Sequence, residues 1–393
     1  MSNLLMISGD RSLAEGKHGA FYNTLEELHK HFEKIDVICP KIRNSKLGIR
    51  NFFDNVEVHP SLWPLIFQPF WILRAGLRVL SSYQLSFTNS QFPDNKETNV
   101  KWQINGKWSM KNDNWVMTVH DYPPFYNGIG AFLLWCRIRI PYLLEIHHIP
   151  GYPKSANFRE WLYRIFAQLF IVIDAWPARA VRVVNQHQTK EFLIRAGVPA
   201  SKIMYIPSIY IDHGIFKPQN EPKEYDLIFV GRLAENKGVD LLLEVAKKSN
   251  LEVLIVGDGP LKKYIDGKIK EWKLVNVKCF GWAKDSQEVA SLINKSKLFV
   301  LTSLNEGGPR VVAEALACGV PVLATSVGII PDIKDACTII DWDVTDIVNK
   351  ANHLLNDEQA YKSKVELGLE VSKQFNKESA IKNYAEKIAS LIS

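Results

Sequence analysis

A glycine-bounded loop near the middle of the chain brings two cations close together. The segment GRLAENKG at 231–238 follows an apolar run at 225–230. Gly231 allows close approach of a ligand, Arg232 offers a planar fork for a phosphate, and Lys237 adds a mobile point charge. Such a loop between a strand and a helix suits a diphosphate. The alternative that this segment leaves open is a solvated arginine and lysine near a helix start.

A second glycine-containing segment predicts a helix that begins at a ligand site. It reads LNEGGPRVVAEALACGVPV at 304–322. Pro309 suits the first helical position, with Gly308 as the cap. Apolar residues at helical spacing supply the buried face of this helix, namely Val311, Val312, Ala315 and Leu316. The free amide groups at its start favour an anion.

Two glutamates, Glu306 and Glu314, flank the start of this helix. Eight residues span about 12 Å along a helix. The carboxyl pair of a glycoside hydrolase lies roughly 5–9.5 Å apart, so we do not expect an acid–base dyad. Beside a diphosphate, carboxylates serve as acceptors for sugar and ribose hydroxyls. The alternative for Glu314 is a local cap or ion pair.

Four linked segments point to a family. GRLAENKG is followed by VGDGP at 256–260, FGW at 280–282 and EGGPRVVAE at 306–314. In order and spacing over 225–332, the chain resembles a family-4 glycosyltransferase of the GT-B fold. Three positions depart from the family's pattern. Gly308 stands where an aromatic residue is common, Arg310 where Asn is common and Ile329 where a second Gly is usual. These departures bear on the shape of the sugar pocket.

The resemblance implies a retaining transfer from a nucleotide-diphosphate sugar to a hydroxyl, with a glycan or lipid-linked glycan as the expected acceptor. Catalytic roles fall to Arg232, Lys237, Glu306 and His147. Donor contacts fall to Gly231, Gly281, Trp282, Gly307, Gly308, Val311 and Glu314. No protein nucleophile is required, because the leaving phosphate takes the acceptor's proton.

The first half of the chain resembles the family through IPYLLEIHHIPG at 140–151. This segment aligns His147 with the residue that usually contacts the donor sugar, and His148 is the neighbouring candidate. Adjacent side chains on a strand point to opposite faces, so we expect one of the two to be structural. On the acceptor side we expect Gly19, His148 and Tyr122, with Lys17, His18 and Tyr126 as further candidates.

A metal site could be inferred from the pair His120–Asp121. However, the pair has no third ligand at a recognisable spacing. The donor loops also supply cations where a metal would otherwise neutralise phosphate. We therefore expect no metal ion and no cofactor beyond the donor substrate.

Short apolar runs that alternate with amphipathic stretches predict an α/β chain with two Rossmann-like parallel-sheet domains facing a central cleft. We expect an acceptor-side domain at 1–207, a hinge at 208–223 and a nucleotide-sugar domain at 224–376. A last helix at 377–393 could cross back to the first domain. Asn-Gly in QINGKW at 103–108 predicts a tight hairpin.

Charge differs between the halves. Residues 1–217 hold 25 Lys and Arg against 17 Asp and Glu, net +8, whereas 218–393 hold 23 against 25, net −2. The basic half suits an anionic partner, although a basic surface kept for solubility is the alternative. It also contains LWPLIFQPFWIL at 62–73, followed by Arg74 and Arg78. Residues 62–80 could lie at an anionic membrane surface or in the core.

The N-terminal segment MSNLLMISGD lacks a basic region, and the five cysteines are scattered. We therefore expect a cytoplasmic protein, with a peripheral position at the inner face of the membrane as an option. Two competing functions remain, a nucleotide-sugar 2-epimerase and a catalytically silent carbohydrate- or membrane-binding scaffold. A nucleic-acid binder lacks a recognition motif in this sequence.

Overall fold

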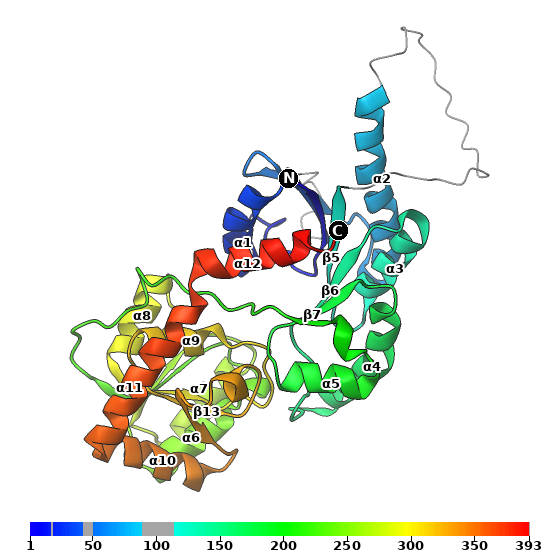
Figure 1. The fold of residues 1–393 in the computed structure, drawn as a ribbon. Helices are drawn as coiled ribbons and strands as arrows, with labels where there is room; N and C mark the ends of the chain where they lie inside the picture. The colour runs from blue at the N-terminus through cyan, green and yellow to red at the C-terminus, as the bar shows by residue number, and fades with distance from the viewer. Residues whose placement is uncertain (17–18, 42–49, 89–113, 393) are drawn as a thin grey trace. The chain divides into compact units, whose positions relative to one another are not determined.

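The computed structural model describes residues 1–16, 19–41, 50–88 and 114–392 (Figure 1). The hairpin expected at 103–108 lies outside these residues. The chain forms two compact units. The first comprises 1–146, 170–182 and 381–393, and the second comprises 147–169 and 183–380.

The strands form two sheets, and each is described by its own order. One has eight strands in the order β3-β4-β2-β1-β5-β6-β7-β8. These are β1 (Asn3–Ile7), β2 (Lys34–Cys39), β3 (Arg50–Phe52), β4 (Val56–Pro60), β5 (Trp115–His120), β6 (Tyr142–Ile146), β7 (Ala180–Val183) and β8 (Ile203–Tyr205). Neighbouring strands from β4 to β6 pair in parallel, and β3 pairs antiparallel with β4 at the edge.

The other sheet has six parallel strands in the order β11-β10-β9-β12-β13-β14. They are β9 (Tyr225–Val230), β10 (Val253–Val256), β11 (Val277–Gly281), β12 (Ser296–Leu301), β13 (Val322–Thr325) and β14 (Cys337–Ile340). The expected α/β fold with two parallel-sheet domains is confirmed. The sequence pattern does not predict β3, β4 and β14. β3 and β14 are short strands at the sheet edges, and β4 alternates apolar with polar residues instead of forming an apolar run.

The helices lie between the strands, as the alternating pattern predicts. Those of the first half are α1 (Ala20–Leu28), α2 (Gln68–Thr88), α3 (Tyr126–Ile138), α4 (Phe158–Ala175) and α5 (Gln188–Ala196), with short 3₁₀ turns η1 (His29–His31), η2 (Leu65–Phe67) and η3 (Ala200–Lys202). Those of the second half are α6 (Val239–Lys248), α7 (Lys262–Trp272), α8 (Ser286–Asn294), α9 (Arg310–Ala317), α10 (Val344–Asn356), α11 (Glu358–Ser372) and α12 (Lys377–Ala389), with η4 (Glu235–Lys237), η5 (Ile330–Ile333) and η6 (Lys373–Phe375).

Central strands of the second sheet such as β10 and β13 are buried on both faces, which explains why they are continuous apolar runs rather than alternating ones, whereas the edge strand β11 is largely exposed. Along β9, Ile228 belongs to a core packed with α8 and α9, whereas Phe229 belongs to a core packed with α6 and α10. Figure 1 shows helices on both sides of this sheet. The sheet is therefore held rigidly, and the loops at its strand ends have a fixed base.

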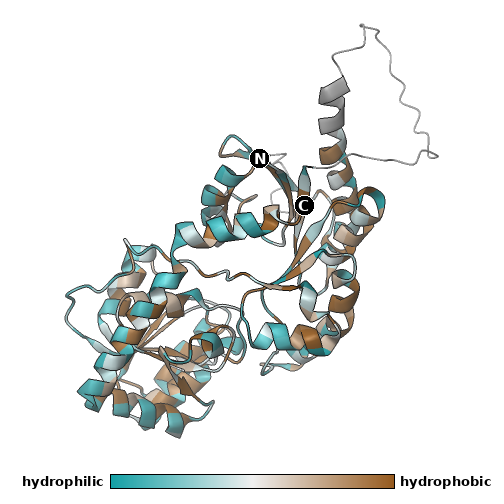
Figure 2. Ribbon diagram, viewed as in Figure 1, coloured by the Kyte–Doolittle hydropathy of each residue, from teal (hydrophilic) through white to brown (hydrophobic). Residues whose placement is uncertain are grey.

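The segment at 62–80 forms part of η2 and α2 and divides into two faces. One face packs on α3, since a side chain at Gly76 would lie 2.5 Å from Leu134. Ile72 on the same face is fully buried. On the opposite face, Phe67 and Phe70 are at least half exposed, and Arg74 and Arg78 are exposed. Figure 2 shows hydrophobic residues along α3 and α4 as well.

The contact-based units differ from the boundary expected at residue 207. Residues 147–169 and 183–207 belong to the second unit. The reason is a set of hydrogen bonds that join them to the loop after β12, for example from Asn305 to the Lys154 carbonyl and from Asn185 to the Gly307 carbonyl. Residues 381–393, most of α12, are grouped with the first unit.

Across the described residues, every helix is too short or too polar to cross a lipid bilayer.

Candidate active site

Two loops of the second unit form the candidate site, one after β9 and one after β12. The two strands are neighbours in the sheet, so their carboxyl ends bring both loops to the same edge. Hydrogen bonds join the loops directly. The Leu304 amide donates to the Asn236 carbonyl at 2.8 Å, and the Thr302 hydroxyl donates to the Lys237 carbonyl at 2.9 Å. These hydrogen bonds tie the two loops of the site to each other.

One glycine of the β9 loop is required by this close approach. Gly238 has a φ of +63°, and a side chain there would lie 2.2 Å from the Thr302 carbonyl oxygen. Any other residue would be strained in that backbone conformation and would also push the two loops apart. Gly238 therefore sets the spacing between the loop that carries Lys237 and the loop that carries Glu306.

A cavity of about 340 Å³, the loop cavity, opens between these loops. It is lined by Phe229, Val230, Gly231, Lys237, Leu301, Glu306, Gly308, Pro309, Arg310, Val311 and Glu314. Six of the residues expected at the site meet in it, namely Gly231, Lys237, Glu306, Gly308, Val311 and Glu314. The helix α9 begins at Arg310, one residue later than expected, with Pro309 in the N-cap position.

A second cavity of about 440 Å³, the histidine cavity, shares Lys237, Glu306 and Gly308 with the first. Its full lining is His147, His148, Ser208, Arg232, Asn236, Lys237, Glu306, Gly307 and Gly308. All four residues expected to be catalytic therefore line this one cavity. Arg232 is exposed there, so its guanidinium is open to an incoming anion.

Lys237 and Glu306 form an ion pair at the boundary of the two cavities. The ammonium donates to Glu306 Oε1, which also accepts a hydrogen bond of 2.8 Å from the Ser303 hydroxyl. An ammonium has three N–H donors, so one bond to the carboxylate leaves two for a ligand. The pair holds the lysine in place and positions the Glu306 carboxylate as an acceptor for hydroxyl groups.

Glu314 has a different environment from Glu306. Burial raises its pKa to about 7, and the charge of Arg310 opposes that rise only in part. Arg310 lies over the Tyr210 ring, with its guanidinium carbon 4.7 Å from the ring centre. A carboxyl group with such a pKa is present in both forms at neutral pH, so it can donate to a hydroxyl as well as accept from one.

The two histidines follow the end of β6 at Ile146 and line the same cavity. Side-chain alternation applies within a strand and both residues lie beyond it, so the expectation that one of them faces away stays a prediction. His148 Nε2 lies 2.9 Å from Asn305 Oδ1. The Asn305 amide nitrogen donates to the Lys154 carbonyl and to Glu160 Oε2, at 2.8 and 2.9 Å.

These bonds fix the tautomer of His148. Since the Asn305 amide nitrogen donates elsewhere, its oxygen must accept, so the Nε2 of His148 carries the hydrogen. Burial lowers the pKa of His148, which favours the neutral ring with its lone pair on Nδ1. The backbone of His147 is also fixed, because a side chain at Gly307 would lie 2.0 Å from the His147 carbonyl oxygen.

Sequence reasoning missed several residues that build the site. Asn305 is fully buried and holds the histidine segment against the β12 loop. Ser303, Asn236 and Ser208 contribute further polar atoms from the loops. Asn305 lies beside Glu306 in the sequence, but a single asparagine in a loop carries no signal that it will be buried.

Other expected residues lie outside both cavities. Gly281 and Trp282 line neither, and Trp282 is 75% exposed. Gly19 and Tyr122 belong to the first unit, where Tyr122 packs so closely on Gly9 that a side chain there would lie 2.3 Å from its ring. Tyr126 begins α3, and Lys17 and His18 lie outside the described residues.

The pair His120–Asp121 does not gather further ligands in the described part of the chain. The Gly128 amide donates to Asp121 Oδ1 at 3.0 Å, and burial raises the pKa of this carboxyl group. Among the described residues, the group that could hold a metal ion is instead Asp36, Glu57 and His59.

Comparison with known proteins agrees with this geometry. Residues 212–370 match the family model described as glycosyl transferases group 1. A putative teichuronic acid biosynthesis glycosyltransferase, TuaC of Bacillus subtilis, is 36% identical over 335 residues, which are 79% of this chain and 77% of that protein.

Two solved structures share the fold over the full chain. Sucrose-phosphate synthase from Thermosynechococcus elongatus has a TM-score of 0.74 at 16% identity and covers 100% of this chain and 99% of its own. Anabaena Alr3699/HepE in complex with UDP and glucose has a TM-score of 0.67 at 16% identity, over 99% of this chain and 100% of its own. On the family model, the extent of the match to the Bacillus relative and the paired parallel sheets, this chain belongs to the group 1 glycosyltransferases and has their GT-B fold.

Proposed function

We propose that the protein transfers a sugar from a nucleotide-diphosphate sugar to a hydroxyl of a glycan or lipid-linked glycan, with retention of anomeric configuration and without a metal ion. The single observation that carries this proposal is the pair of adjoining cavities that share Lys237 and Glu306. One cavity suits the nucleotide diphosphate, and the other suits the sugar and the attacking hydroxyl.

The leaving group is the first requirement of such a reaction. As the bond from the anomeric carbon to the diphosphate oxygen breaks, negative charge develops on that oxygen. In our proposal Arg232 and Lys237 stabilise it, together with the backbone amides of Gly307, Gly308 and Val311 near the start of α9. Cations already placed at the site need little reorganisation during the reaction, which is why they lower the barrier.

The sugar and the ribose are the second requirement. Glu306, held in place by Lys237 and Ser303, accepts hydrogen bonds from hydroxyls of the transferred sugar. Glu314, with its pKa raised to about 7, contacts the ribose hydroxyls. His147, which lines the histidine cavity, contacts the sugar, and Gly307 allows its backbone to approach.

The proton balance needs no protein base. The new bond forms between the anomeric carbon and the acceptor oxygen on the face that the diphosphate leaves. The departing phosphate oxygen takes the acceptor's proton, so the products are the glycoside and the protonated nucleoside diphosphate. This assignment makes retention the natural outcome, because donor and acceptor share one face of the sugar.

The experiment is a donor screen followed by product analysis. We would begin with UDP-glucose, since Anabaena Alr3699/HepE, which shares the fold, has been solved in complex with that nucleotide sugar. Thermal shift identifies the binding nucleotide sugar, and mass spectrometry with NMR identifies the glycoside and its anomeric configuration. Glu306→Gln serves as the site variant and Glu366→Gln, a substitution on α11, as the matched control. An inverted product, or a requirement for added metal, would contradict the proposal.

The same screen separates the competing functions. A 2-epimerase would convert the nucleotide sugar with no acceptor present. A scaffold would bind a glycan but give no product with any donor. We favour transfer because Arg232 and Lys237 meet in a cavity beside a carboxylate, and a second carboxyl group lines the adjoining cavity. Glycan binding alone does not need such an arrangement.

We also propose that the first unit contacts a membrane or a lipid-linked acceptor. The support is the exposed apolar surface of η2, α2 and the residues just before them, made of Leu62, Leu65, Ile66, Phe67 and Phe70. Arg74 and Arg78 follow along the same helix, four residues apart, and could reach anionic lipid headgroups. The basic balance of residues 1–217 would add attraction that salt weakens. Such binding would place the protein at the cytoplasmic face.

A further inference from the structure

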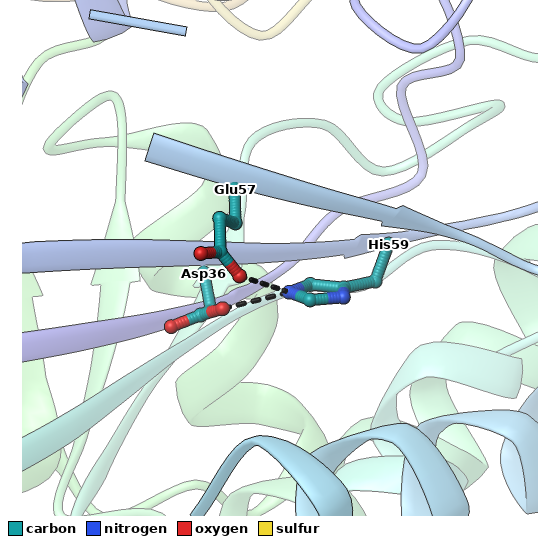
Figure 3. Close-up of side chains that lie close together, drawn as sticks. All are labelled: Asp36, Glu57 and His59. Carbon is teal, nitrogen blue, oxygen red and sulfur yellow. Dashed lines mark hydrogen bonds and ion pairs between the residues drawn. The ribbon is translucent and has the colours of Figure 1, made fainter. Parts of the chain in front are cut away.

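Three potential metal ligands meet on two neighbouring strands of the first unit. β2 and β4 pair in parallel with Asp36 directly beside Glu57. His59 lies two residues beyond Glu57, so its side chain leaves the same face of the strand. Figure 3 shows the imidazole pointing between the two carboxylates. None of these residues belongs to either cavity of the candidate active site.

The distances are those of a site that could close around an ion. His59 Nε2 lies 2.7 Å from Asp36 Oδ1 and 3.9 Å from Glu57 Oε2 (Figure 3). One donor atom from each of the three residues lies within 4.8 Å of the others. A zinc ion takes ligands at about 2.0–2.2 Å. Only small side-chain movements would bring all three atoms to that distance from a common centre.

Asp36 supplies a second, independent reason to expect a ligand. Its side chain is 1% exposed, and its Oδ2 atom accepts no hydrogen bond among the described residues. Lys34 Nζ is 3.8 Å from that atom, beyond hydrogen-bond distance, and donates instead toward Glu57 Oε1 at 2.9 Å. A buried carboxylate with an unsatisfied oxygen is costly unless a charge compensates it.

The charges of the three side chains and of Lys34 also favour a bound cation. Carboxylates directly opposite each other on neighbouring strands repel. Lys34 compensates one of the two negative charges, and a cation at the imidazole nitrogen would compensate the other. Because Lys34 holds Oε1 of Glu57, the Oε2 atom remains directed toward the imidazole. Glu57 is 34% exposed, so an ion has a route from solvent and a water can complete its coordination.

We propose that Asp36, Glu57 and His59 bind one divalent transition-metal ion of the zinc class, which ties β2 to β4. The ligands are the Asp36 carboxylate, Glu57 Oε2 and His59 Nε2, with Asp36 binding through both oxygens so that its unsatisfied Oδ2 is also used, and the ion takes the place of the imidazole proton. An imidazole nitrogen with two carboxylate oxygens suits zinc, cobalt or manganese better than magnesium, which prefers oxygen ligands alone. The role is structural and is separate from the proposed transfer reaction.

The test is a metal titration of the full-length, tag-free protein after chelator treatment and dialysis. Zn²⁺ binding is measured by calorimetry, and Co²⁺ binding by the visible absorption of a tetrahedral nitrogen–oxygen site. We expect one ion per chain. Loss of even an outer-sphere partner lowers metal affinity by about 10–100-fold, so loss of a ligand in His59→Gln or Glu57→Gln should lower it by at least about 100-fold.

The same titration provides the control and the outcomes that would contradict the proposal. His353→Gln removes an exposed histidine of α10 and should bind Zn²⁺ as the wild type does. Glu57 is partly exposed, so Glu57→Gln keeps the test valid if a change at buried Asp36 prevents folding. Equal Zn²⁺ affinity in wild type and His59→Gln, or no binding to the wild type, would overturn the proposal.

Discussion

In the second unit the candidate catalytic groups come from loops that follow β9 and β12, whereas in the first unit Asp121 directly follows β5 and Asp174 lies on α4. Lys237, Glu306 and Arg232 reach open cavities and are partly accessible. By contrast, Asp121 and Asp174 are 2% and 3% exposed. Buried carboxyl groups must be protonated, paired or bound to a cation, whereas charged groups at loop ends are solvated until a ligand binds. The open cations of the second unit suit the anion binding that we propose, and the first unit holds charges inside its structure.

The largest effect that this comparison predicts is at the phosphate-contacting cations. Arg232→Ala and Lys237→Ala should each lower kcat, because loss of one preorganised donor at a developing oxyanion costs roughly 2.7–4 kcal/mol, a factor of about 100–1,000. Arg195→Ala, at an exposed arginine on α5, is the control. Steady-state kinetics with the identified donor would measure the change. Wild-type kcat in either variant would remove the β9 loop from the proposed mechanism.

A glycine pair tests whether the loops must stay closely packed. Gly307→Ala places a methyl group 2.0 Å from the His147 carbonyl oxygen, and the backbone must shift. We expect a loss of roughly 1–3 kcal/mol in stability, as for other overpacked sites, and a fall in kcat. Gly267→Ala on α7 meets nothing within 4 Å and should be neutral or slightly stabilising. Denaturant unfolding compares the two, and equal free energies of unfolding would contradict the proposed close packing.

The apolar surface of the first unit predicts binding to anionic vesicles. Arg74 and Arg78 should each contribute about 1 kcal/mol to binding at a negatively charged surface. The double variant Arg74→Ala/Arg78→Ala should therefore bind the vesicles about tenfold more weakly than wild type, or weaker still, as measured by co-sedimentation at low salt. Lys247→Ala/Lys248→Ala on α6 provides a control of equal charge change in the second unit. If wild type stays in the supernatant at low and high salt, the membrane proposal fails.

The buried acid pair of the first unit predicts a stability that depends on pH. Burial raises the pKa of Asp121 and of Asp174, and the charge of Asp121 adds to the rise for Asp174. Folded-state pKa values above the unfolded ones give stability that is present at low pH and lost as the pH rises through them. Asp174→Asn should flatten the fall in Tm between mildly acidic and alkaline buffers. An unchanged slope would show that the pair does not titrate in this range.

The smallest expected effect is that of a chelator on transfer. Because Arg232, Lys237 and the amides near α9 contact the phosphates in our proposal, turnover should persist in excess EDTA. The proposed site at Asp36 predicts instead a lower Tm under the same conditions, through loss of an ion that binds the folded state. Turnover is therefore measured well below the Tm. Complete loss of activity that magnesium or manganese restores would contradict metal-independent transfer.

Much of the second unit can be predicted from its sequence, because the residues of short segments favour particular strands, turns and helices. The run at 225–230 and the glycines of 231–238 predict a buried strand followed by a tight loop, and both are present. Apolar spacing predicts the helix at 309–318, which begins at Arg310. Interactions within a few residues of each other leave a periodic pattern, which explains why these elements are predictable.

Contacts between segments that lie far apart in the sequence cannot be predicted in the same way. Asn305 contacts Lys154 and Glu160, about 150 positions earlier in the chain, and nothing local to Asn305 marks it as buried. That His147 and His148 line one cavity with residues of the β9 and β12 loops also depends on contacts far along the chain, such as that of His148 with Asn305. Trp282, expected at the donor, is exposed outside both cavities.

The sequence by itself determined the α/β alternation, the two loops with their cations and carboxylates, and the family. Only the tertiary structure decided that Lys237 pairs with Glu306, that burial raises the pKa of Glu314, and that Asp36 meets His59 across two strands. The physical reason is that local propensity and side-chain spacing act along the chain, whereas burial and charge pairing depend on groups that folding brings together from far apart.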